Sequence, residues 1–157
     1  MPVRRFFAHA DLRKSETWTV VLALVGIAVA SYLTAVHYRD SLLVCSGASD
    51  CETVQNSSYS KLLGIPVAIL GLAMYVASLG LAIARLARAA LAERVTILLF
   101  VMLFAGFLFT TYLTWLELFV IDAVCQWCVV SALITTLLLA IEGTRVYQLL
   151  TLEPTEP

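Results

Sequence analysis

The sequence is poor in charge. Charged residues make up 13% of its 157 residues and the net charge is −1, whereas about 25% is usual in soluble domains. Without an excess of basic residues, nucleic acid is a poor partner class, and such low polarity excludes a disordered chain. No glycine-rich nucleotide-binding motif is present, so neither flavin nor nicotinamide is supported. The two histidines, His9 and His37, do not extend a metal-ligand set.

Apolar residues, in contrast, make up 61% of the chain, and they gather in long runs. A bilayer-spanning helix needs about 20 predominantly apolar residues, and none of the runs alternates polar with apolar residues as a membrane barrel strand does. We therefore predict an all-α membrane protein, a bundle of four transmembrane helices over residues 18–36, 65–84, 95–116 and 124–141. Small residues within these spans are expected to let helices pack closely; they are Gly26, Ala30, Gly71, Ser78 and Gly80.

The basic residues predict the orientation. Eight of them flank one side of the predicted spans (Arg4, Arg5, Arg13, Lys14, Arg85, Arg88, Arg94 and Arg145) and two the other (Arg39 and Lys61). By the positive-inside rule, both termini are expected in the cytoplasm and the first and third connections outside. The expected organisation is a cytoplasmic segment over 1–17, a transmembrane domain over 18–145 with a long outer loop at 38–64, and a cytoplasmic tail over 146–157.

All four cysteines fall in two pairs on the predicted outer face. Cys45 and Cys51 lie in the long loop with five residues between them, and Cys125-Gln-Trp-Cys128 opens the last span. The outer face of a bacterial inner membrane is oxidising, and a helix N-terminus stabilises the reactive thiolate. These features favour a redox relay over an inert disulfide or a Cys₄ zinc site, whose cysteine pairs usually lie two to four residues apart. Because the final acceptor must take two electrons within the membrane, a lipid-soluble quinone is the natural candidate.

Four motifs, taken in order, resemble the vitamin K epoxide reductase family, its bacterial members most closely, over about residues 15–145. They are Cys45-x5-Cys51, then Ser57, then Gly64-Ile65-Pro66 before the second span, and Cys125-Gln-Trp-Cys128 at the start of the fourth. Each motif alone is weak, but their order is specific.

The resemblance implies a four-helix bundle around a quinone (ubiquinone or menaquinone). Cys128 would lie next to the quinone ring, and Cys125 would form a mixed disulfide with Cys51. Cys45 would then meet a secreted thioredoxin-fold (DsbA-like) protein. Ser57, which would otherwise be interpreted as a loop or cap serine, would sit near the quinone and Cys128.

The resemblance thus predicts a thiol–disulfide oxidoreductase that reoxidises this partner on the periplasmic face and passes two electrons to quinone. Many bacterial relatives carry a fused thioredoxin-like domain, whereas this sequence ends at Pro157, so the partner is expected to be a separate protein. Ala132 stands where the vertebrate enzymes have tyrosine, which argues against vitamin K epoxide as substrate. The alternatives are reduction of a quinone or its epoxide by thiols and, in another class, a non-catalytic membrane subunit or Cys₄ metal-binding module. A further four-helix oxidase family, that of DsbB, has its two cysteine pairs in the reverse order.

Other residues carry weaker predictions. Trp127 is a candidate to pack over the quinone or to lie at the membrane interface. Glu117 and Asp122, at the ends of the third connection, are expected to face solvent. The apolar run 118–121 between them is expected to shield the quinone mouth or bind a partner. Pro66 is expected to start a helix, where its missing N–H costs little.

Overall fold

The computed structural model describes residues 3–39 and 51–152 of the chain, and most of them are helical. The elements in order are α1 (Val3–Tyr38), α2 (Cys51–Asn56), the 3₁₀ turn η2 (Ser58–Ser60), β1 (Lys61–Leu62), β2 (Ile65–Pro66), α3 (Val67–Ala87), η3 (Ala89–Leu91), α4 (Ala92–Leu116), the π-helical turn η4 (Glu117–Ile121) and α5 (Gln126–Leu152).

Four helices of the described part of the chain are long and apolar enough to cross a membrane, which confirms the prediction of a helical membrane protein. They are Ser15–Tyr38, Val67–Ala87, Ala92–Ile121 and Gln126–Thr151. The last of these continues well past the predicted end at residue 141, so that residues 146–152 of the predicted tail are helical as well.

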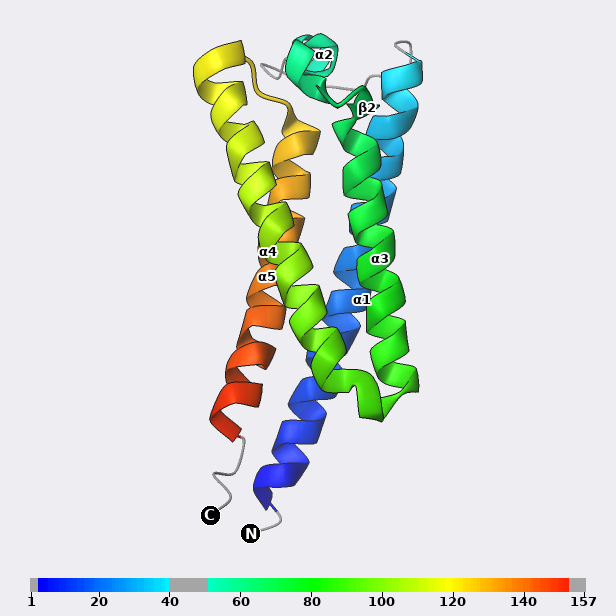
Figure 1. Cartoon of the computed structure of the whole chain (residues 1–157), viewed down its shortest axis with the longest axis vertical. Helices are drawn as coiled ribbons and strands as arrows, with labels where there is room; N and C mark the ends of the chain where they lie inside the picture. Colours follow the sequence, from blue (N-terminus) through cyan, green and yellow to red (C-terminus); the bar gives the residue numbers. More distant parts are fainter. Residues whose placement is uncertain (1–2, 40–50, 153–157) are drawn as a thin grey trace.

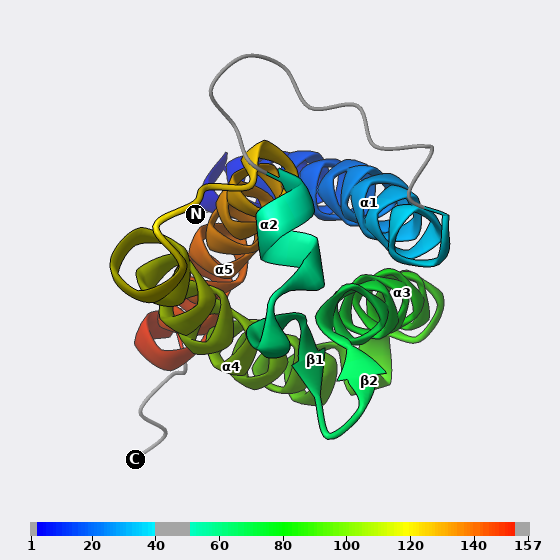
Figure 2. The same ribbon diagram turned by 90° about the horizontal axis from the view of Figure 1, so that it is seen from above.

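The long helices form a closed ring in which each packs against two others. Helix α1 contacts α3 and α5, and α4 contacts the same two helices from the other side; Figure 2 shows this arrangement from above. The short elements α2, β1 and β2 lie across one end of the bundle, here called the α2 end, whereas α1 begins and α5 ends at the opposite end (Figure 1).

The second long helix begins two residues later than predicted because a small hairpin precedes it. Leu62 pairs with Ile65 across an antiparallel bridge, and the two turn residues, Leu63 and Gly64, have φ angles of 54° and 85°. Turns with two positive φ angles match the twist of a tight hairpin. Pro66 ends the second strand and directly precedes α3, where its missing N–H leaves no helical bond unmade.

The small residues of the spans have different roles. A Cβ on Gly26 would lie 2.5 Å from the ring of Tyr75, so Gly26 permits close contact between α1 and α3 as predicted, and Ser78 is fully buried. The packing prediction is wrong for Gly71 and Gly80, where a Cβ would meet nothing within 4 Å. Gly71 instead lines a cavity.

The outward faces of the bundle are apolar. Large apolar side chains that are exposed in the isolated chain occur on every long helix; they include Leu24, Val25, Val76, Ile83, Leu98, Val101, Leu133 and Leu137. Contiguous apolar surface of this kind is covered by lipid in a membrane-spanning bundle.

A cluster of four buried charged residues joins the helices at the opposite end. The charge cluster consists of Glu16 on α1, Arg85 on α3, and Glu142 and Arg145 on α5. Arg85 binds Glu142 through two hydrogen bonds of 2.7 and 3.0 Å and Glu16 at 2.9 Å. Arg145 also pairs with Glu16, and Thr96 of α4 accepts a bond from Arg85 at 3.0 Å.

The charge cluster was missed by the sequence analysis, which counted Arg85 and Arg145 among the basic residues flanking the spans. Each is paired with buried carboxylates, so neither is a free positive charge at the membrane surface. Two positive and two negative charges balance one another, which is how ionisable residues are tolerated within a membrane protein.

Candidate active site

Two free thiols lie at the start of α5, at the α2 end. Cys125 directly precedes the helix and is fully buried, whereas Cys128 lies in its first turn and is partly buried. The two side chains are hydrogen-bonded to each other. The Cys-x-x-Cys motif therefore holds its sulfur atoms together at a helix N-terminus, as predicted.

The N-terminus of α5 stabilises a thiolate at Cys125. The Cys125 carbonyl accepts a bond from the Val129 N–H at 3.1 Å, which opens the helix, and the Cys125 sulfur accepts bonds from the N–H groups of Trp127 and Cys128. This is the pattern of a helix N-cap residue. The bond from the Cys128 thiol, together with these N–H groups, lowers the pKa of Cys125 below its ordinary value, although burial and the nearby Glu117 act in the opposite direction.

Glu117 is the residue whose prediction failed most clearly, because it is buried and not solvated. Its side chain is at the centre of the thiol site, with 4% of the residue exposed. The carboxylate accepts a hydrogen bond from the Cys125 backbone N–H at 3.1 Å, and it shares the single S–H of Cys128 with the Cys125 sulfur. One signal in the sequence was available: a single acid at the end of an apolar span, eight residues before Cys125, is a candidate functional residue.

The connection between α4 and α5 brings Glu117 back to the thiols. The π-helical turn η4 ends at Asp122, which has a left-handed backbone with φ 54°, a conformation that aspartate tolerates better than most residues. The Ala123 N–H then donates to the Glu117 carbonyl at 3.1 Å, so the chain reverses direction. Asp122 itself is exposed, as predicted.

The α2 end also carries Cys51, the first residue of α2. Cys51 is disulfide-bonded, has 1% of its surface exposed, and belongs to the same buried cluster as Val54, Ala123 and Cys125. Figure 2 shows α2 lying across the end of the bundle beside the start of α5. Cys45 lies outside the described residues.

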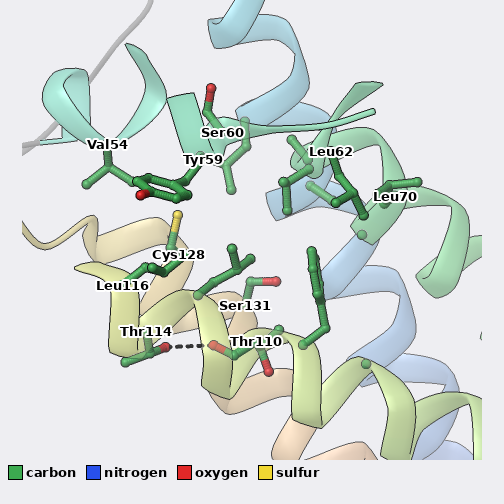
Figure 3. A pocket seen from close by; sticks show the side chains of 18 of the residues that line it. Val54, Tyr59, Ser60, Leu62, Leu70, Thr110, Thr114, Leu116, Cys128 and Ser131 are labelled. Atoms are coloured by element: carbon green, nitrogen blue, oxygen red, sulfur yellow. Dashed lines mark hydrogen bonds between the residues drawn. The ribbon is translucent and has the colours of Figure 1, made fainter. Parts of the chain in front are cut away.

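A largely apolar cavity of about 370 Å³ opens beneath α2 and between the long helices. The sulfur of Cys128 points into it, toward the ring of Tyr59 (Figure 3). The walls come from α1, α3, α4 and α5 and the roof from the segment between α2 and β1; lining residues include Leu33, Val54, Tyr59, Gly71, Met74, Met102, Phe109 and Ile121. Volumes of 300–1,000 Å³ are typical of small-molecule sites.

Most hydroxyl groups on the walls bond back to their own helix. Thr114 donates to the Thr110 carbonyl at 3.0 Å (Figure 3), and Thr110 donates to the carbonyl of Phe107. Ser57 lines the cavity, and its hydroxyl donates to the Val54 carbonyl at 2.8 Å at the end of α2. Ser57 is thus a cap serine and a wall residue at the same time.

A group of three hydroxyls lies deeper in the cavity and was missed by the sequence analysis. The Tyr75 hydroxyl is 2.9 Å from the hydroxyls of both Ser131 and Thr135, and the latter two residues line the cavity on the same face of α5 as Cys128. Spacings of three and four residues place them on one helix face. Ala132, at the position compared with the vertebrate tyrosine, is absent from the lining residues and borders a separate groove.

Trp127 lies apart from the cavity-lining residues, and the run 118–121 reaches the cavity with one of its residues. The ring of Trp127 packs against Tyr32 with centroids 5.0 Å apart, and Trp127 is not among the residues that line the cavity. Within the run, Ile121 lines the cavity, whereas Phe119 is 73% exposed.

The cavity suits a quinone in shape and chemistry. Its walls are mainly aliphatic and aromatic, and the Ser131 and Thr135 hydroxyls add polar groups to one part of them. Cys128 and Glu117 lie on its wall near the roof. A bound quinone would supply the two-electron acceptor that the thiols themselves lack.

Fold and site together define a multi-pass helical membrane protein with a buried dithiol on the wall of an apolar cavity. The sequence model of the vitamin K epoxide reductase family matches residues 17–142, and the chain belongs to this family. Membership makes it an integral-membrane thiol–disulfide oxidoreductase of a quinone-linked family. None of the curated proteins compared with the chain matches it.

Proposed function

We propose that the protein oxidises the dithiol of a secreted thioredoxin-fold (DsbA-like) protein and passes two electrons to a membrane quinone, supporting disulfide bond formation. The observation that carries the proposal is the position of the Cys128 thiol. It lies on the cavity wall and is hydrogen-bonded to Cys125, which shares a buried cluster with the disulfide-bonded Cys51.

The proposed relay has two exchanges before the cavity is reached. The partner's two thiols reduce a Cys45–Cys51 disulfide and leave the partner oxidised. Cys51 then attacks an oxidised Cys125–Cys128 pair through a mixed disulfide with Cys125, which returns the loop pair to its disulfide and leaves two thiols on α5. Finally Cys125 and Cys128 re-form their disulfide while two electrons and two protons pass to the quinone.

The described cysteines fit this relay: Cys51 is disulfide-bonded, and Cys125 and Cys128 are free thiols that are hydrogen-bonded to each other. A disulfide-bonded Cys51 cannot contribute a thiolate to a Cys₄ zinc site. We further propose that the α2 end faces the periplasm of a bacterial inner membrane, because the relay needs an oxidising compartment.

Trapping tests the order of the exchanges. In Cys51→Ser mixed with a thioredoxin-fold partner whose second active-site cysteine is replaced by serine, a mild oxidant such as diamide should link Cys45 to the partner's remaining cysteine in a complex that has no resolving thiol. In Cys128→Ser, the mixed disulfide between Cys51 and Cys125 should accumulate within the chain. Non-reducing electrophoresis and mass spectrometry identify both products. Absence of both linkages in folded protein would refute the relay.

The direction of electron flow is measured with the same protein. Purified chain mixed with reduced partner and a short-chain ubiquinone or menaquinone should consume partner thiols and produce quinol in equal amounts. Consumption of added dithiol with vitamin K epoxide as the preferred acceptor would instead support the reductase alternative.

A further inference from the structure

The buried carboxylate of Glu117 has an unusual set of neighbours. A buried carboxylate is costly unless it is paired or hydrogen-bonded, and every salt bridge among the described residues involves Arg85 or Arg145, at the other end of the bundle. Glu117 is instead bonded to the Cys125 N–H at 3.1 Å and to the Cys128 thiol. Its partners are therefore the reacting residues.

Glu117 also borders the space where the electron acceptor would bind. It lines the same cavity as Cys128 and Ser131. The Glu117 side chain thus contacts the Cys128 thiol, which must lose a proton, and faces the cavity, where the reduced acceptor must gain one. Among the described residues that line the cavity, Glu117 is the one carboxylate.

The other titratable groups near Glu117 are few. Helix α2 contributes Cys51, which is disulfide-bonded, and Glu52, which is exposed. Helix α5 contributes Cys125 and Cys128, and the roof of the cavity contributes Tyr59. Among the described contacts, the carboxylate is hydrogen-bonded to the Cys128 thiol and to the backbone N–H of Cys125.

We propose that Glu117 is the proton acceptor for the Cys128 thiol during electron transfer to the cavity, an inference that rests on the proposed function. The Cys128 S–H bond breaks, its proton moves to the Glu117 carboxylate, and an S–S bond forms with the Cys125 thiolate. Two electrons leave the sulfur pair for the quinone. Glu117 then gives this proton to the reduced quinone. The quinone takes its second proton from solvent, which balances the proton that Cys125 lost to solvent when it became a thiolate.

A merely positioning role for Glu117 makes a different prediction. Glutamine keeps an oxygen that accepts the Cys125 N–H bond but cannot take a proton, so Glu117→Gln separates the two roles. Asp122→Asn is the matched control, because Asp122 is an exposed acid of the same connection and asparagine tolerates its left-handed backbone.

The first measurement needs no quinone. Full-length protein in lipid nanodiscs is reduced, and iodoacetamide labelling of Cys125 is followed against pH by mass spectrometry. Because the Glu117 charge opposes thiolate formation at Cys125, E117Q should label Cys125 at least about threefold faster below the midpoint pH, and D122N should match the wild type. Unchanged labelling in E117Q would show that Glu117 is uncharged in the wild type and therefore cannot accept a proton. That result would overturn the proposal.

The second measurement isolates the proton transfer. Reduced protein is mixed with short-chain ubiquinone, quenched with acid, and assayed for free thiols. Loss of a general base typically costs about 100-fold or more, so E117Q should slow this oxidation by that amount. Formation of the Cys51–Cys125 linkage in a Cys128→Ser background should not be slowed by E117Q, since that exchange uses the Cys125 thiolate and does not involve the Cys128 proton. An E117Q oxidation rate within about threefold of wild type would overturn the proposal.

The two proposals fail in different ways. If the wild type itself does not lose thiols to ubiquinone, the proposed function falls; if only the E117Q effect is missing, the role of Glu117 falls alone. Should E117Q not fold, Glu117→Asp decides, because it keeps the charge but withdraws it by one methylene. E117D should keep the Cys125 labelling midpoint while slowing the quinone step at least about tenfold; an unchanged quinone step would overturn the proposal.

Discussion

Replacing Arg85 by methionine should strongly destabilise the bundle without altering the thiol chemistry. Arg85 is buried and makes two hydrogen bonds to Glu142, at 2.7 and 3.0 Å. Its loss would leave Glu142, which is fully buried, with the Thr19 hydroxyl at 3.1 Å and a longer contact to Arg145 at 3.6 Å. Methionine fills similar space, so the main effect is an unpaired buried charge.

The expected size follows from that unpaired charge. Breaking a buried ion pair by removing one partner costs about 3–5 kcal/mol. For a chain of this length, each kcal/mol lowers the midpoint of thermal unfolding by about 2–4 °C, so R85M should unfold about 6–20 °C lower. Removing both partners is much less costly than removing one, so R85M combined with Glu142→Leu should recover a large part of the loss.

Thermal unfolding followed by tryptophan fluorescence in lipid nanodiscs measures these shifts. Arg88→Met is the control, because Arg88 is an exposed arginine at the same end of α3. Quinone-dependent oxidation by folded R85M should remain at the wild-type rate, since the thiols lie at the α2 end. If R85M unfolded within about 2 °C of R88M, the argument that the charge cluster stabilises the bundle would be refuted.

Two further predictions concern the thiol site. The lowered pKa of Cys125 means that its thiolate persists to lower pH than that of an ordinary cysteine. Cys128→Ala removes the hydrogen-bond donor and should move the iodoacetamide-labelling midpoint of Cys125 upward, whereas an unmoved midpoint would show that the Cys128 thiol is not responsible. Gly71→Leu should project a side chain into the cavity. The KM for short-chain ubiquinone should then rise about tenfold or more, while the labelling of Cys125 stays unchanged. Gly80→Leu, also in open space on α3, is the control, and equal KM values for the two variants would exclude this cavity as the quinone site.

The cavity and the thiols bring the features that the proposed relay needs to one end of the bundle. The start of α5 places a thiolate-stabilising N-terminus at the mouth of an apolar cavity, and α2 brings Cys51 to the same buried cluster. The disulfide-bonded Cys51, the two thiols of α5 and the apolar cavity therefore lie at the same end of the bundle.

The sequence alone determined the four membrane helices and the place of the Cys-x-x-Cys motif. Transfer of an apolar segment into lipid depends on the residues of that segment, so the spans could be located from local composition. The N-terminal position of Cys125 is also local, because it depends on where the apolar run of α5 begins.

Only the tertiary structure decided the environment of the charged and cavity-lining residues. Glu117 was expected in solvent and is buried against Cys125 and Cys128, and Arg85 was counted as a surface charge but is paired with Glu142. Whether a charge is solvated or paired depends on the side chains that neighbouring helices place beside it, and residues 57 positions apart in the chain supply that pair. Such partners are set by helix packing, which no local pattern in the sequence encodes.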